Sequence, residues 1–302
     1  MNSSRTAVIK KKDGRGAFAR KLHDYQLLTK FRLSSLVVFS SLMAYMMAAG
    51  GSVSWLPLVL LGLGGWLVTG AANALNQVLE RDYDKLMKRT EDRPLATGRM
   101  SVSEAVMSAG FMSMIGITLL ALFNPWTSLL GMISLICYSF VYTPMKRVTP
   151  FAVFVGAIPG ALPTMIGVVA FEGEITAMAL VLFAIQFLWQ FPHFWAIAWL
   201  AHEDYTNAGF YLLPSRAGRE DRNTGLQSFI YALFLVPVVV IPYMMGQVGL
   251  LSTALLVLLS MAYSFYGWRF FSDLNRQSAR KLMFSSFFYL PLVLIVLVLD
   301  KL

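Results

Sequence analysis

Nine long apolar runs constrain the fold of this chain more than any other feature. Each holds roughly 18 to 24 mostly apolar residues, which lets an α-helix cross a bilayer core of about 30 Å. They lie at residues 33–50, 55–79, 103–123, 126–143, 151–170, 177–200, 224–245, 250–271 and 281–299. The sequence therefore predicts an all-α membrane protein with nine transmembrane helices in a bundle.

Composition and charge distribution support this prediction. Hydrophobic residues make up 57% of the 302 residues and charged residues only 14%, which is outside the range of soluble domains. Lys and Arg collect in short cytoplasmic loops of membrane proteins. Placing the N-terminus inside puts every Lys and Arg except Lys301 on the inner side. We therefore expect a cytoplasmic N-terminus and a C-terminus outside.

Residues 1–30 form a basic N-terminal arm ahead of a single transmembrane domain at residues 31–302. The arm has two open interpretations: a topology signal in a disordered tail, or a segment that rests on anionic lipid headgroups of the bilayer. Topology and the arm account for the net charge of +9, so no nucleic-acid partner is needed. The arm lacks a cleavable signal, and its acid and clustered lysines fit a transit peptide poorly. A bacterial inner membrane is therefore favoured over a mitochondrial one.

Two polar stretches match at an offset of 120 residues, and each follows an apolar run on the inner side. The matched pairs are Asp84 and Asp204, Pro94 and Pro214, Gly98 and Gly218, and Arg99 and Arg219. An acid followed by a proline and a Gly-Arg pair suits a loop that binds an anion through a cation. The match predicts an internal repeat of about four, four and one helices.

The first copy ends in a row of oxygen ligands. Asn76, Glu80 and Asp84 are spaced by four residues, so they follow one helical face. Carboxylate and amide oxygens suit Mg²⁺, which bridges carboxylates to substrate phosphates. Asp82 points away from this face. A charged helix end facing water is the alternative, but Asn73 and Asn76 lie inside the apolar run, where polar groups are expensive.

Basic residues follow the row and complete a predicted diphosphate site, in which metal and bases share the phosphate charge. Those of the first loop are Lys85, Lys88, Arg89, Arg93 and Arg99, and the second loop contributes Arg219. Lys146 and Arg147 lie in another inner loop. They are either a topology signal for their span or further diphosphate contacts.

The second copy differs from the first. Asp204 is retained, but His193 stands where the first copy has Asn73. His193 lies among aromatic residues, including Trp189, and Tyr142 precedes the inner loop with Lys146. The imidazole is either hydrogen-bonded to a neighbouring helix or in contact with a substrate, as a ligand to porphyrin iron or as an orienting donor. The sequence leaves these alternatives open.

Several stretches carry a family resemblance: residues 76–84, 87–90 and 93–95, residues 142–147 with 156–161, and residues 192–195 leading to Asp204, Tyr205, Ala208 and Gly209. They resemble the intramembrane aromatic prenyltransferase superfamily and, within it, the protoheme IX farnesyltransferase (heme O synthase) branch. The resemblance covers nearly the whole chain after residue 30. Glu80 stands where an aspartate is more usual, and Leu200 and Ala208 leave the second aspartate motif incomplete.

The resemblance implies a nine-helix bundle that transfers farnesyl from farnesyl diphosphate to a vinyl group of heme B, giving heme O. It implies Mg²⁺ held by Asn76, Glu80 and Asp84, with Asp204 from the second copy, and diphosphate contacts from the nearby bases. A heme site near His193, Trp189 and Tyr142 is also implied. Heme A synthase and a terminal oxidase are implied as partners.

Two other functions are consistent with parts of the sequence. A prenyltransferase for a quinone precursor would keep the fold, but such a small acceptor needs no histidine in an aromatic setting. A secondary transporter would explain the internal repeat. Transporters place their sites near the bilayer midplane, whereas these acids lie at one face.

Overall fold

The structure is a computed structural model that describes residues 16–214 and 221–301, and within them it is helical without strands. Nine helices in these ranges are long and apolar enough to span a membrane, at the nine predicted positions. Their principal segments are α2 (Phe31–Ala49), α3 (Trp55–Asp84), α4 (Val102–Ala121), α5 (Pro125–Ile136), α7 (Ala152–Glu172), α8 (Ala177–Leu200), α10 (Arg222–Val238), α12 (Leu250–Asp273) and α13 (Arg276–Leu299). The predicted all-α membrane fold is confirmed, and the chain is an integral membrane protein.

Short elements extend or connect the long helices. A 3-10 turn, η1 (Gly50–Ser52), follows α2, and α11 (Ile241–Met244) follows α10. Helix α5 continues through a π-helical segment, η2 (Cys137–Tyr142), into α6 (Thr143–Met145). The wide turn brings the rings of Tyr138 and Tyr142 to 5.5 Å between centroids. Both tyrosines therefore lie side by side at the C-terminal end of this span.

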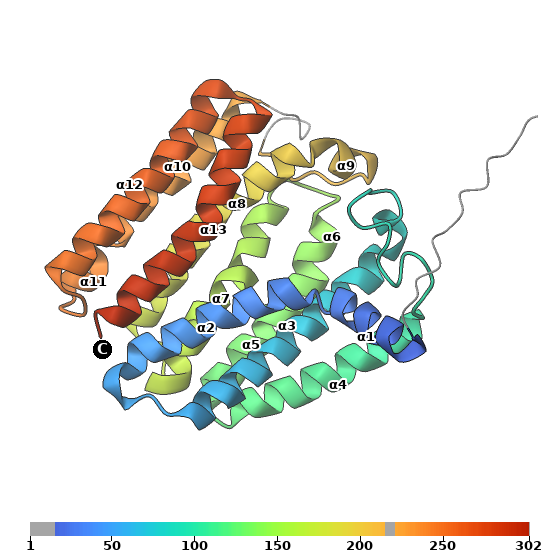
Figure 1. The fold of residues 1–302 in the computed structure, drawn as a ribbon, viewed down its shortest axis with the longest axis horizontal. Helices are drawn as coiled ribbons and strands as arrows, with labels where there is room; N and C mark the ends of the chain where they lie inside the picture. The colour runs from blue at the N-terminus through green and yellow to red at the C-terminus, as the bar shows by residue number, and fades with distance from the viewer. Residues whose placement is uncertain (1–15, 215–220, 302) are drawn as a thin grey trace, which may run out of the picture.

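Helix α7 is the central helix of the bundle. In its most apolar stretch 78% of the residues are buried, which is the highest share among the spans of the described chain. It packs between α2 and α8 (Figure 1). A Cβ on Gly167 would lie 2.1 Å from the Ser41 carbonyl oxygen, so glycine lets the α7 and α2 backbones touch. Such small residues drive helix packing where lipid removes the hydrophobic contribution.

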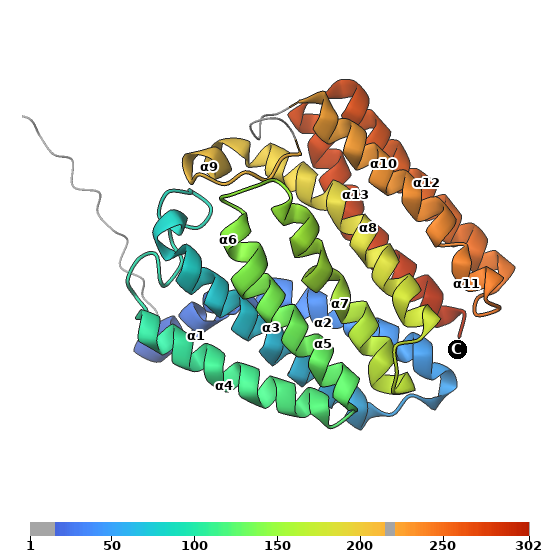
Figure 2. The same cartoon turned by 180° about the vertical axis from the view of Figure 1, so that it is seen from behind.

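The polar loops gather at one end of the bundle. The loop after α3 and the short helix α9 (His202–Asn207), which follows α8, lie next to each other in both views (Figure 2). They follow the second and sixth spans, four spans apart, as the predicted repeat requires. The C-terminus lies at the opposite end (Figure 1). The chain therefore crosses from one end of the bundle to the other overall.

Part of the N-terminal arm is an ordered helix, α1 (Ala17–Leu28), joined to the loop after α3. Arg99 Nε donates to Asp24 Oδ1 at 2.9 Å. Lys21 Nζ lies 2.5 Å from Glu104 Oε1 at the start of α4. These ion pairs anchor α1, so the disordered-tail interpretation is wrong for residues 17–28.

Candidate active site

The predicted oxygen row lies on one buried face of α3. Asn76, Glu80 and Asp84 are 1%, 5% and 1% exposed. Asp82 points to the surface, where it pairs with Arg81 and Lys85. The row forms because α3 continues past its apolar run and ends only at Asp84. Three oxygen-bearing side chains are thus brought together inside the protein, which their helical spacing predicted.

Each member of the row is bound by a cation from another segment. Asn76 Oδ1 accepts from Lys30 Nζ at 2.9 Å, and Arg93 Nη1 donates to both oxygens of Asp84 at 2.7 Å. Glu80 forms an ion pair with Lys146, at the C-terminal end of α6. We call these six residues the acid–base cluster: Lys30, Asn76, Glu80, Asp84, Arg93 and Lys146. The two buried carboxylates, Glu80 and Asp84, are thus each paired with a cation, as a buried charge requires.

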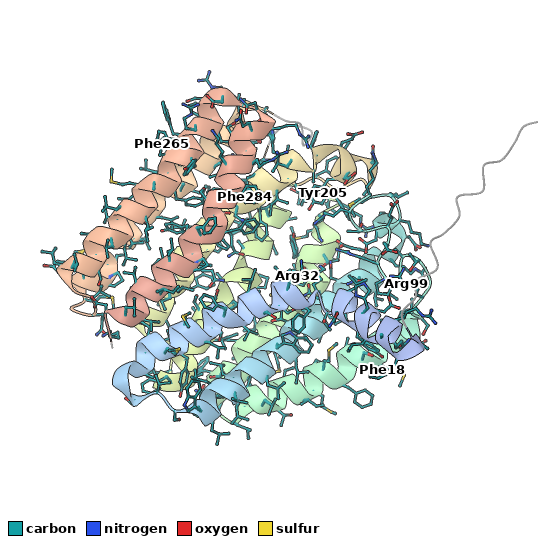
Figure 3. The ribbon with its side chains drawn as sticks, viewed as in Figure 1. Phe18, Arg32, Arg99, Tyr205, Phe265 and Phe284 are labelled. Atoms are coloured by element: carbon teal, nitrogen blue, oxygen red, sulfur yellow. The ribbon has the colours of Figure 1, made fainter. Side chains whose placement is uncertain are left out.

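Two further predicted bases bridge the loops at this end of the bundle. Arg89 Nη2 donates to Tyr205 Oη at 2.9 Å, which ties the first loop to α9. Arg147 stacks 4.4 Å over the Tyr83 ring and donates to its hydroxyl. Tyr205 and Arg99 both project at this end of the bundle (Figure 3). These contacts join the loops beside the acid–base cluster.

The remaining predicted bases have other positions. Lys85 pairs with Asp82, and Lys88 is exposed. Arg99 binds Asp24 and Asp92, which fixes α1. Arg219 and Gly218 lie outside the described residues. The structure therefore brings Arg93 and Lys146 into the acid–base cluster and assigns Arg99 a structural contact.

Asp204 lies on α9 and is half-buried. Within residues 16–214 and 221–301, no three His, Cys, Asp or Glu side chains are close enough to hold a metal ion together. Glu80, Asp84 and Asp204 therefore do not form a three-carboxylate centre. An Mg²⁺ ion would use two carboxylates and an amide oxygen, and would take its other ligands from water and substrate phosphates. This donor set fits Mg²⁺, which keeps waters and bridges carboxylates to phosphates.

An apolar cavity of about 250 Å³ adjoins the acid–base cluster. Helices α2, α3, α5, α7, α8 and α13 all contribute to its wall. Tyr138 lies on the boundary, because it lines the cavity and its hydroxyl accepts from Lys30 Nζ at 3.4 Å. Leu36 and Phe287 line the cavity and are also 56% and 44% exposed. The cavity thus reaches the lipid-facing surface between α2 and α13.

Glycine shapes the cavity wall. A Cβ on Gly156 of α7 would lie 2.6 Å from ring atoms of Tyr142. The tyrosine ring can therefore lie flat against the α7 backbone beside the cavity. Tyr142 is also the ring over which Lys146 Nζ lies, 4.8 Å from the centroid. The apolar wall and the charged end are in direct contact at this residue.

His193 is held on the cavity wall by α13. Its Nδ1 lies 2.6 Å from Ser286 Oγ, and its ring stacks on Trp189 with 4.9 Å between centroids. The Ser286 hydroxyl donates to the Met283 carbonyl, so its oxygen accepts the proton on Nδ1. The unprotonated nitrogen is therefore Nε2, which makes no hydrogen bond within the described residues. An unpartnered acceptor is thus available at the cavity.

Sequence reasoning missed three residues of this site. Lys30 and Ser286 contact predicted residues, and Thr143 accepts from Asn76 Nδ2 at 3.1 Å. Lys30 carried only the signal of a basic residue before a span, which positive-inside topology already explains. Ser286 is 93 residues from His193. No periodicity links two such distant positions before the bundle is assembled.

The fold and the site together define an intramembrane enzyme for amphiphilic substrates, with a charged end for an anionic group beside an apolar cavity. The chain belongs to the UbiA prenyltransferase family, whose model matches residues 37–290.

Relatives of similar length share much of the sequence. A protein of Cytophaga hutchinsonii named protoheme IX farnesyltransferase is 46% identical over 284 residues, covering 94% of this chain and 99% of the relative. One of Christiangramia forsetii with the same name is 43% identical, covering 93% and 94%. The resemblance noted in the sequence is confirmed by these relatives.

Solved structures share the fold at low identity. A structure of digeranylgeranylglyceryl phosphate synthase has a TM-score of 0.79 at 16% identity and covers 93% of this chain and 99% of its own. A UbiA homolog from Archaeoglobus fulgidus, bound to GPP and Mg²⁺, has a TM-score of 0.67 at 18% identity and covers 91% and 99%. At such low sequence identity, these structures show only that the arrangement of the helices is shared.

Proposed function

We propose that the protein transfers a farnesyl group from farnesyl diphosphate to a vinyl group of heme B, giving heme O. The observation that carries the proposal is the contact between the acid–base cluster and an apolar cavity walled by His193 and Trp189. One end suits a diphosphate, and the other suits an isoprenoid tail and a flat aromatic acceptor. Relatives named protoheme IX farnesyltransferase over nearly their whole length support this choice of substrates.

Asn76, Glu80 and Asp84 would hold Mg²⁺ at the diphosphate, without Asp204, because the three carboxylates do not come together in the described residues. The ion, when bound, neutralises negative charge that develops on the leaving oxygens. Arg93 and Lys146 already lie at these carboxylates and can donate to the remaining phosphate oxygens. Arg89, Arg147 and Arg219, with Lys85 and Lys88 farther out, are proposed to add positive potential at the loops. Preorganised charges of this kind lower the barrier to ionisation.

The apolar cavity protects the reaction from water. As the bond between the diphosphate oxygen and C1 of farnesyl breaks, positive charge spreads over the allylic carbons. Tyr138 and Tyr142 present aromatic faces at the boundary between the cluster and the cavity, and such faces attract cations. The vinyl carbon of heme B then bonds to C1. Water adds to the new cation on the acceptor as a hydroxyl and loses a proton, and diphosphate leaves.

His193 is proposed to bind the heme. Because its Nδ1 proton is donated to Ser286, its Nε2 lone pair can ligate the porphyrin iron. Trp189 is fixed in turn, since its Nε1 donates to the Ser286 carbonyl at 2.9 Å. Together with Tyr142, Trp189 gives the porphyrin an aromatic wall. This arrangement favours the iron-ligand interpretation over a purely structural histidine.

The topology and setting are part of the same proposal. The N-terminus and the acid–base cluster would lie on the cytoplasmic side and the C-terminus outside, in a bacterial inner membrane; the gathering of Lys and Arg at the cluster end supports this orientation. Residues 1–30 would form a cytoplasmic arm and residues 31–302 one catalytic domain. Heme A synthase and a terminal oxidase are proposed as downstream partners.

The test uses the purified full-length chain in nanodiscs with heme B, farnesyl diphosphate and Mg²⁺. We expect a more hydrophobic pigment on reversed-phase separation, with a mass that corresponds to heme O. Parallel reactions replace heme B by a hydroxybenzoate or a naphthoate. Prenylation of the small acceptor and not of heme would assign the enzyme to quinone synthesis and refute the proposal.

A further inference from the structure

The junction between α1 and α2 has an unusual backbone at Lys30. Its φ of 48° and ψ of 54° place it in the left-handed region, which non-glycine residues adopt at a cost of order 1 kcal/mol or more. Two amides of α3 hold the junction. Gln77 Nε2 donates to the Leu27 and Leu28 carbonyls, and Asn73 Nδ2 donates to the Thr29 carbonyl at 3.3 Å.

These contacts give Asn73 and Gln77 a role that is separate from the oxygen row. Buried amides inside a span are expensive unless they are hydrogen-bonded, and here they satisfy carbonyls released where the helix is interrupted. Glycine would fit the backbone at Lys30 without strain. Lys30 thus adopts a backbone conformation that favours glycine, and two buried amides hold the junction in it. This combination indicates that the lysine side chain itself has a role at this position.

The Lys30 side chain points into the acid–base cluster. Its Nζ donates to Asn76 Oδ1 at 2.9 Å and lies 3.4 Å from Tyr138 Oη. An ammonium group has three donors, and neither of these partners is a carboxylate. Lys30 is thus a cation whose partners in this structure are neutral oxygens, one of them on a proposed metal ligand.

The cluster holds more positive than negative charge. Two carboxylates, Glu80 and Asp84, face three cations, Lys30, Arg93 and Lys146. One net positive charge plus one Mg²⁺ balances the about three negative charges of an ionised diphosphate ester. Without Lys30, the cluster and Mg²⁺ together would carry one positive charge too few to balance the diphosphate.

We propose that Lys30 is a further diphosphate-binding residue that exchanges partners on substrate binding: its ammonium leaves Asn76 Oδ1 as Mg²⁺ takes that oxygen, and donates to a diphosphate oxygen instead. The proposal rests on the proposed function for the identity of metal and diphosphate. When the metal binds alone, it must compete with Lys30 for the Asn76 oxygen. When metal and diphosphate bind together, the metal takes the Asn76 oxygen and Lys30 gains a diphosphate oxygen as its partner. Metal and diphosphate therefore bind with positive coupling, and Lys30 is one source of it.

The experiment compares two substitutions of Lys30 with a matched control in full-length protein in nanodiscs. Lys30→Met keeps the length of the side chain without its charge, and Lys30→Gly also relieves the left-handed strain. Arg32→Gln is the control, because Arg32 is an exposed base two residues along the same junction (Figure 3). Mn²⁺ binding is measured by electron paramagnetic resonance, with and without farnesyl S-thiolodiphosphate, an analogue that resists ionisation. Calorimetry gives the affinity for the analogue.

The proposal predicts opposite changes in the two affinities. Both Lys30 variants should bind Mn²⁺ alone about 2- to 10-fold more tightly, because a competing hydrogen bond is lost. They should bind the analogue with Mn²⁺ about 10- to 100-fold more weakly, since a charge-assisted hydrogen bond is lost. Arg32→Gln should stay within about twofold of the wild type for both, as exposed charges contribute little.

Four results would overturn the proposal. Parallel losses of both affinities, or failure of both Lys30 variants to give folded protein, would make Lys30 a structural residue. Values equal to those of Arg32→Gln would remove it from the site while leaving the proposed function intact. Absence of Mn²⁺-dependent analogue binding in the wild type would refute the proposed function as well.

Discussion

Replacing Asp84 by Asn tests whether the buried row ionises the diphosphate. Asp84 is 1% exposed, and both of its oxygens accept from Arg93 at 2.7 Å. The substitution keeps the volume but removes a negative charge and a proposed metal ligand. Loss of one preorganised electrostatic contact lowers kcat by about 100- to 1000-fold, or roughly 3–4 kcal/mol. We expect kcat/KM for farnesyl transfer to fall by at least that factor.

Asp82→Asn is the matched control for this prediction. Asp82 lies two residues away on the same helix, but its carboxylate is exposed and pairs with Arg81 and Lys85. Its substitution should change turnover less than about twofold. The assay follows pigment formation by purified protein at saturating heme B, after size-exclusion chromatography confirms folding. Equal losses in both variants, or near-normal turnover in folded Asp84→Asn, would refute the assignment of the row.

Three further perturbations separate structural from functional contacts. Arg99→Gln should lower the stability of the fold by about 1 kcal/mol, because it removes a partly exposed ion pair with Asp24. The temperature of thermal unfolding should fall, while the turnover of folded protein should not change. Ser286→Ala should weaken heme binding about 10-fold or more by freeing the tautomer of His193; unchanged heme titrations, or an equal effect of Ser285→Ala on the same helix, would contradict this. Chelation of divalent metals should abolish turnover and weaken binding of the prenyl diphosphate, and added Mg²⁺ should restore both; full activity in chelator would argue against a metal.

The fold could be predicted largely from residue type and length. Bilayer thickness fixes the length of a span, and the exclusion of charge from lipid marks its ends. The nine predicted spans therefore match the nine long helices of the described chain. The helical stretch at residues 17–28 was less visible, because α1 is held by ion pairs with residues far along the chain, such as Arg99 and Glu104.

The site was predictable where its residues share one helix. Asn76, Glu80 and Asp84 follow from a spacing of four residues, and the same periodicity placed Asp82 on another face. Contacts between helices left no such signal. Arg99 resembled a phosphate-binding base but anchors α1, and Lys30 resembled a topology signal but reaches Asn76. Charge alone cannot distinguish these roles until the helices are packed.

The two loops of the repeat are not equivalent in the structure. The first follows the helix that carries the oxygen row and supplies Arg93, while the second follows a helix whose histidine faces the apolar cavity. Their contact through Arg89 and Tyr205 brings both halves to one end of the bundle. This arrangement allows an anionic donor and a flat acceptor to meet at the boundary marked by Tyr138.

The central claim is that a farnesyl cation formed at the acid–base cluster is captured by a heme vinyl in the cavity and that water quenches the product cation. The most direct measurement is mass spectrometry of the pigment formed from heme B and farnesyl diphosphate in ¹⁸O-labelled water. We predict a farnesylated heme that carries one ¹⁸O atom in its new hydroxyl group. A heme of unchanged mass, or a farnesylated product without solvent oxygen, would contradict the account.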